Sequence, residues 1–149
     1  MIERGFWLYV WRIASPVGDL LYVGRTGDSS SSNAATPFAR MGQHLGTNER
    51  QNMVRRHLDR RGVPPEKCTS FDLIAYGPIF EEADDWGIHT ERRDVIAALE
   101  KALAEGLASS GYEVLNRVND RHDLDIRLWK AVQEAFAADF PRLGRFLEQ

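Results

Sequence analysis

The sequence predicts an α+β fold, built on a small antiparallel three-stranded sheet flanked by helices. Three observations predict it: an aromatic hairpin near the N-terminus, one alternating segment in the middle of the chain, and several stretches with helical periodicity. The chain has 149 residues, of which 43% are hydrophobic and 28% charged, and this is typical of one globular domain with a sizeable core. The expected order is strand, strand, helix, helix, strand, helix, with extra helices at the C-terminus.

The strands are predicted by aromatic and β-branched side chains. Residues 6–13 have this composition, the turn cluster SPVGD follows, and the same pattern returns over residues 20–25. Together these segments predict a β-hairpin. A third strand is expected over residues 70–77, where the sequence SFDLIAYG alternates between apolar and polar side chains.

Two short helices are expected between the hairpin and the third strand. The polar, low-complexity segment over residues 28–36 predicts a loop. At its end, Thr36 supplies a helix cap and Pro37 occupies the first helical position, so the first helix is expected over residues 37–45. A second helix is expected over residues 49–61, before the sequence GVPP.

A long helix is expected after the third strand. Thr90 is its predicted cap, Gly111 its predicted end, and its apolar residues recur on one face: Ile96, Leu99, Leu103 and Leu107. The acidic run EEADD before it indicates a solvated segment or a helix start rather than a metal site. The last thirty residues predict one or two further helices with one buried face: Trp129, Val132, Phe136 and Phe140.

Composition excludes several classes of protein. No apolar run approaches the ~20 residues that span a bilayer, so no membrane partner is expected. The single cysteine, Cys68, excludes an internal disulfide and a cysteine-rich zinc site, which makes the cytoplasm the expected compartment. Net charge is −3, but residues 38–67 carry seven Lys and Arg against three acids. This section is either a phosphate-facing surface or a solvated arginine-rich helix.

A set of polar and aromatic residues follows these elements in a fixed order. Tyr22-Val23-Gly24 lies at the end of the second strand. Arg40 and His44 share one face of the first helix at i, i+4 spacing. Glu100 lies in the long helix, and Asn116 follows that helix. This order resembles the GIY-YIG nuclease family over roughly residues 7–119. The resemblance implies a nuclease domain over residues 1–119 and a helical extension over residues 120–149 packed on the same domain, which covers the core or forms a homodimer contact.

The first tripeptide of the family signature departs from its pattern. At the usual hairpin length, the tyrosine of the GIY tripeptide falls at Trp11, whose indole offers only an N–H donor. Tyr9 lies two positions earlier on the same strand face, roughly 6–7 Å away, a gap too large for a simple exchange, and it could replace Trp11 only through a shift or a bulge of the strand. Alternatively, Tyr22 and His44 suffice, or the domain binds without cleaving.

The resemblance implies metal-dependent endonuclease activity that hydrolyses phosphodiester bonds in DNA. Glu100 would hold one divalent ion, Mg²⁺ or Mn²⁺, and Arg40 would bind phosphate oxygens. Tyr22 and His44 would orient or deprotonate the attacking water, and Asn116 would hold either the architecture of the site or Glu100. Five arginines are candidates for contacts with nucleic acid: Arg25, Arg50, Arg55, Arg56 and Arg60. The alternatives are a catalytically impaired module of the same fold that binds nucleic acid or a protein partner, and an unrelated α+β domain.

Overall fold

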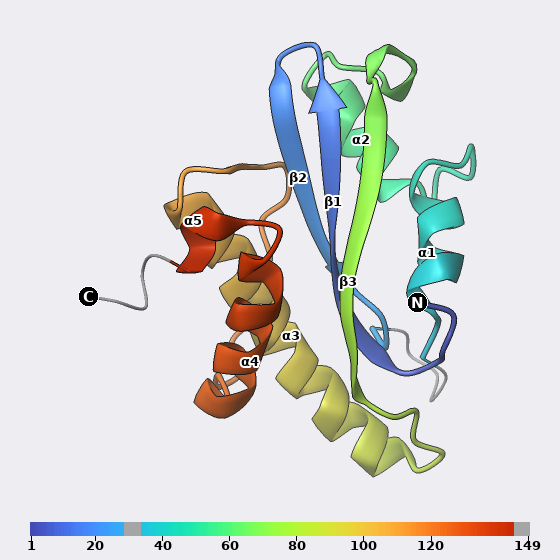
Figure 1. Cartoon of the computed structure of the whole chain (residues 1–149). Helices are drawn as coiled ribbons and strands as arrows, with labels where there is room; N and C mark the ends of the chain where they lie inside the picture. The colour runs from blue at the N-terminus through green and yellow to red at the C-terminus, as the bar shows by residue number, and fades with distance from the viewer. Residues whose placement is uncertain (29–33, 145–149) are drawn as a thin grey trace.

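The sheet of this protein has four strands rather than the three that the sequence predicts. In the computed structural model, which describes residues 1–28 and 34–144, their order is β3-β1-β2-β4; Figure 1 shows the first three side by side. β1 (Phe6–Ser15) and β2 (Gly18–Arg25) form the expected hairpin, and β3 (Ser70–Phe80) pairs antiparallel with β1. The fourth strand, β4 (Glu113–Val114), runs parallel to β2 and is too short to leave a periodic pattern. The fold class is α+β, as predicted.

The helices between the hairpin and β3 are shorter than expected. α1 (Pro37–His44) begins as predicted, because the Thr36 side chain accepts a backbone N–H of the first turn. α2 (Met53–Arg60) begins four residues after the predicted start, because the preceding backbone folds into a turn around the Asn48 carbonyl. One turn of 3₁₀ helix, η1 (Pro65–Lys67), leads to β3. Within the predicted polar loop, residues 29–33 lie outside the described part of the chain.

The long helix α3 (Trp86–Ser109) begins four residues before the predicted cap at Thr90. The Asp85 carboxylate accepts the backbone N–H of Ile88 at 2.9 Å, so the acidic run does stand at a helix start. The helix ends as predicted before Gly111, whose φ of 85° is readily adopted only by glycine. Its predicted apolar stripe is fully buried: Ile96, Leu99, Leu103 and Leu107.

Helices cover both faces of the sheet (Figure 1). α3 packs on one face together with α4 (Ile126–Ala137) and α5 (Pro141–Gly144), and the core there includes strand residues that alternate along β1 and β2. The C-terminal helices contribute buried side chains to this same core, namely Val132, Phe136, Phe140 and Leu143, with Trp129 packed against it. α1 and α2 lie against the other face, where Tyr9 and Tyr22 point. Among the described residues, no helix combines the length and apolarity needed to cross a membrane.

Candidate functional site

Two tyrosines of the hairpin point toward α1 and α2. The β1–β2 pairing is regular throughout, and it places Tyr9 opposite Gly24 and Trp11 opposite Tyr22. Because alternate residues share a face, the three aromatic side chains enter one buried cluster beneath α2. Gly24 leaves the space that the Tyr9 ring fills, since a Cβ atom at that position would stand 2.5 Å from the Tyr9 Oη atom.

His44, the last residue of α1, joins the two tyrosines. The Tyr9 Oη atom lies 2.6 Å from His44 Nε2, and the Tyr22 ring centroid lies 5.2 Å from that of the imidazole. Burial, assisted by the charge of Arg40, lowers the pKa of His44 to about 4, while burial raises the pKa of Tyr9 well above its usual value. The phenol and the imidazole are therefore both neutral, and the tautomer of His44 decides which of them donates the hydrogen bond. The other ring nitrogen, Nδ1, is buried without a hydrogen-bond partner in the described structure.

Trp11 lies near this group but makes no comparable polar contact. Its ring stands edge-on to His44 with centroids 6.4 Å apart, and its indole nitrogen is buried without a partner among the described residues. At the usual hairpin length, the tyrosine of a GIY tripeptide would fall at Trp11. In the structure, the hydroxyl that reaches His44 is that of Tyr9, and the pairing of β1 and β2 has no bulge.

Arg40 extends from the same helix as His44 and is paired with a carboxylate. Its Nη2 atom donates to Asp28 Oδ1, while its Nε atom is buried without a partner in the described part of the chain. Arg40 also lines a surface groove of about 440 Å³, whose other polar residues are Arg4, Thr36, Gln43 and Gln51. The sequence did not single out Asp28, because one acid at the start of a polar loop carries no periodic signal.

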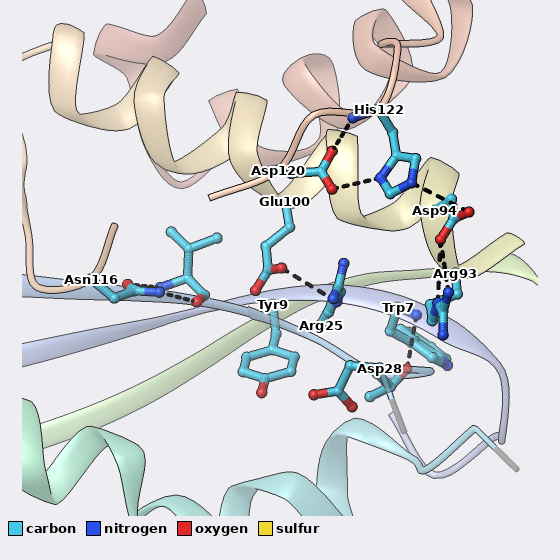
Figure 2. Close-up of polar contacts among 12 residues, drawn as sticks. Trp7, Tyr9, Arg25, Asp28, Arg93, Asp94, Glu100, Asn116, Asp120 and His122 are labelled. Atoms are coloured by element: carbon cyan, nitrogen blue, oxygen red, sulfur yellow. Dashed lines mark hydrogen bonds and ion pairs between the residues drawn. The ribbon is translucent and has the colours of Figure 1, made fainter. Parts of the chain in front are cut away.

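Glu100 approaches the hairpin from α3, on the opposite face of the sheet from α1. Its Oε2 atom lies 3.4 Å from Arg25 Nε at the end of β2 (Figure 2). Burial raises the pKa of Glu100 to about 7; Arg25 opposes this shift, and the charges of Asp28 and Asp120 add to it. Glu100 therefore carries a proton for much of the time near neutral pH. Its charge also contributes to raising the pKa of both hairpin tyrosines, so it lies within electrostatic reach of them.

A hard divalent cation would find one strong protein ligand here, the Glu100 carboxylate. Among the described residues, no three His, Cys, Asp or Glu side chains converge to hold an ion by themselves. Mg²⁺ commonly binds through one or two carboxylates and completes its shell with water and phosphate, so a single carboxylate fits this ion. The raised pKa of Glu100 supports the fit, because a buried carboxylate that Arg25 neutralises only in part gains from a nearby cation.

Asn116 holds the second strand from the segment that follows β4. Its Oδ1 atom accepts the Val23 N–H at 3.0 Å, and its Nδ2 atom donates to the Val23 carbonyl at 2.7 Å (Figure 2). The amide thus satisfies both backbone groups of Val23 as a neighbouring strand would. Val23 lies between Tyr22 and Gly24, so Asn116 supports the centre of the tripeptide rather than the carboxylate of Glu100.

The other arginines expected to contact nucleic acid lie in α2 or just before it. Arg55 donates to Glu66 at 2.7 Å. Arg50 and Arg56 line a surface groove of about 480 Å³ that also contains two acids, and Arg60 is exposed. The fold therefore brings Arg25 and Arg40 to the hairpin but leaves these four apart from it, interspersed with carboxylates.

His57 stands beside the tyrosines and was not anticipated from the sequence. Its ring centroid lies 5.6 Å from that of Tyr22, and burial, followed by the nearby arginines, lowers its pKa. It shares the inner face of α2 with Val54 and Leu58, which are both fully buried. The spacing of these three residues is the signal that could have identified it.

No protein-family model, no curated protein and no solved structure matches this chain. Residues singled out in the sequence reach the hairpin from separate elements: His44 of α1 contacts Tyr9, and Glu100 of α3 contacts Arg25.

Proposed function

We propose that this chain is a GIY-YIG-type endonuclease that hydrolyses phosphodiester bonds in DNA with the help of one Mg²⁺ or Mn²⁺ ion. The observation that carries the proposal is the hydrogen bond between Tyr9 and His44 beside Tyr22. The Tyr9 ring fills the space left by Gly24, which lacks a side chain, and the Tyr9 hydroxyl and the Tyr22 ring both lie beside the His44 imidazole. Such a group can orient a water molecule and accept its proton.

The protonation states suggest how this group would act. Both tyrosines have raised pKa values, so each is a neutral phenol at pH 7 and a hydrogen-bond partner for water rather than a ready base. In the tautomer that carries its proton on Nδ1, His44 Nε2 accepts the Tyr9 hydrogen. A proton taken from water by the Tyr9 oxygen can pass on as the Tyr9 proton moves to Nε2. The negative charge of a bound phosphate would favour this transfer, because it stabilises the imidazolium.

Arg40 and Glu100 would supply the charges that a phosphodiester requires. The Arg40 guanidinium would bind nonbridging phosphate oxygens through two parallel hydrogen bonds. Glu100 would lose its proton and hold the divalent cation, and its ion pair with Arg25 would break. When bound, the cation neutralises charge developing on the phosphate and leaving oxygen. Asn116 would keep the hairpin in place through Val23.

A second candidate is a module of the same fold that binds nucleic acid or a protein partner without cleaving. It is favoured by the pairing of both charged groups within the chain, Arg40 with Asp28 and Glu100 with Arg25. Burial also favours it, because Tyr9 is only 2% exposed and a substrate must reach its hydroxyl.

A plasmid-nicking assay tests the proposal. Purified protein with Mg²⁺ or Mn²⁺ should convert supercoiled DNA to the nicked form, and EDTA should stop the reaction. Glu100→Gln should reduce the rate by about 100-fold or more, since it removes the cation ligand. The matched control is Glu105→Gln on the same helix, where the side chain is 66% exposed and should be dispensable. Absence of cleavage with either metal, together with DNA binding that Arg55 and Arg56 substitutions weaken, would favour the second candidate.

Two further features concern the cellular compartment and the oligomeric state of the protein. Cys68 is free, and a single free cysteine suits the reducing cytoplasm that we propose as its compartment. A homodimer through the C-terminal helices would have to use their outer faces, because Val132, Phe136 and Phe140 are already buried within the chain.

A further inference from the structure

Asp28 stands among the charged groups that surround the end of the hairpin. It follows β2 by three residues, and its carboxylate accepts a hydrogen bond from Arg40. Its charge helps to raise the pKa values of three groups around it: Glu100, Tyr9 and Tyr22. Asp28, which has no role in the proposed catalysis, therefore influences the protonation of three residues that do.

The contact between Asp28 and Arg40 resembles the contact that a phosphate would make. A carboxylate oxygen on a guanidinium and a phosphate oxygen on a guanidinium use the same donors and similar geometry. Asp28 engages only Nη2, and Arg40 Nε remains buried without a partner among the described residues. An anion with more oxygens could satisfy both donors, which Asp28 does not do.

The pair is also accessible to a competing ligand. The side chain of Arg40 is 25% exposed and that of Asp28 is 39% exposed, and Arg40 lines the surface groove described above. Ion pairs with this degree of exposure are weak, because water solvates each partner once they separate. Displacement of Asp28 by a bound anion is therefore energetically feasible.

We propose that Asp28 occupies Arg40 in place of a phosphate group and thereby sets the affinity of the site for phosphodiesters. A nucleic-acid phosphate would bind by displacing this carboxylate, so binding is weaker than Arg40 alone would allow. The identity of the ligand rests on the proposed function, whereas the competition itself depends only on the Asp28–Arg40 contact. Neutralising Asp28 should strengthen anion binding about two- to fivefold, the range expected for a partly exposed ion pair.

The test is a binding measurement in EDTA, where no cleavage occurs. The dissociation constant of a short labelled DNA duplex is measured by fluorescence anisotropy, and that of inorganic phosphate by calorimetry. Asp28→Asn should bind both ligands about two- to fivefold more tightly than wild type. Asp19→Asn is the matched control, because it removes the same charge from an exposed position at the turn end of β2. It should bind as wild type does.

The dependence on Arg40 separates direct competition from a general change in charge. In an Arg40→Gln background, Asp28→Asn should give no gain in affinity. Unchanged or weaker binding by Asp28→Asn would overturn the inference, as would an equal gain from Asp19→Asn or a full gain without Arg40.

The outcomes for Asp28 and for the proposed function remain distinguishable. If wild type nicks plasmid but Asp28→Asn binds phosphate no better, the role of Asp28 is wrong and the nuclease proposal stands. If no variant cleaves DNA but Asp28→Asn binds inorganic phosphate more tightly in an Arg40-dependent way, the role of Asp28 stands and the nuclease proposal fails.

Discussion

Gly24 and Tyr9 face each other across the hairpin so closely that a methyl group at Gly24 would collide with the phenol. A Cβ atom there would lie 2.5 Å from Tyr9 Oη, well inside van der Waals contact. The absence of a side chain at Gly24 therefore permits the Tyr9–His44 hydrogen bond. Gly24 has an ordinary backbone conformation, so its role is to leave space rather than to adopt an unusual φ angle.

Gly24→Ala should therefore displace the Tyr9 ring from His44. We expect a loss of about 1–3 kcal/mol in the free energy of unfolding, measured by urea denaturation, because the buried cluster cannot accept an extra methyl group without strain. Gly42→Ala is the control: its Cβ would meet nothing within 4 Å, and alanine in a helix should add roughly 0.5–1 kcal/mol. Equal effects of the two substitutions would contradict this account of Gly24.

Tyr9→Phe should reduce the nicking rate far more than Trp11→Phe does. The first substitution removes only the hydroxyl that forms a hydrogen bond with His44, and loss of one such hydrogen bond in a proton-transfer group lowers rates by about 100-fold or more. The second removes an indole N–H that has no partner among the described residues, together with part of a buried ring. Rates are compared on supercoiled plasmid after circular dichroism has shown both variants to be folded. A larger loss from Trp11→Phe would return the catalytic position to Trp11.

Glu100→Gln should stabilise the protein at alkaline pH. The pKa of Glu100 is about 7 in the folded protein against 4.5 for the free side chain, so folding favours its protonated form. The wild type therefore loses stability as pH rises from about 4.5 through 7, and a neutral glutamine avoids this loss. At pH 8 we expect the variant to be more stable by on the order of 1–3 kcal/mol in urea denaturation, with little difference near pH 4.

The same measurement with Mg²⁺ tests the cation site. Saturating Mg²⁺ should stabilise wild type at pH 8 and leave Glu100→Gln unchanged, because a ligand stabilises only the state that binds it. Glu105→Gln, which alters an exposed carboxylate, should behave as wild type in both conditions. If Glu100→Gln is less stable than wild type at pH 8 without Mg²⁺, the pairing of Glu100 with Arg25 outweighs the cost of burying its charge.

His122 should also make the protein less stable as pH rises, because its pKa too is raised in the folded protein. Its Nδ1 atom lies 2.7 Å from Asp120 and its Nε2 atom 3.4 Å from Asp94 of α3, so it ties the segment before α4 to that helix (Figure 2). The hydrogen bond with Asp120 is the main cause that raises its pKa above 6.5, and Arg93 opposes the shift. Stabilisation is therefore complete below pH 6.5 and is lost as pH rises through the folded pKa.

His122→Ala should consequently melt at a lower temperature than wild type near pH 5.5 and at the same temperature near pH 9. Asp94→Asn should remove part of this pH dependence while keeping the histidine, because one of its two carboxylate partners becomes neutral. Thermal melts of the three proteins across this range provide the measurement. A deficit that is the same at both pH values would show that the ring contributes packing rather than charge.

Local patterns predicted most of the fold. The hairpin, α1, β3 and the buried stripe of α3 follow from alternation, helical spacing and capping residues, all of which act over a few neighbouring positions. The strand β4 was missed because two residues carry no period, and its existence depends on pairing with β2 from far along the chain. The start of α3 was misplaced because both Asp85 and Thr90 are good caps, and the structure uses the first.

The candidate site, like the fold, was predicted only in part from the sequence. The sequence by itself determined which residue types were available and in what order, because Tyr22, Arg40 with His44, Glu100 and Asn116 stand at spacings that can be read along the chain. Only the tertiary structure decided that Tyr9 rather than Trp11 meets His44, since that depends on the register of the whole hairpin. It also decided the partners of the charged groups. Ion pairs such as Asp28–Arg40 and Arg25–Glu100 join elements whose relative position is set by packing, and no local pattern encodes them.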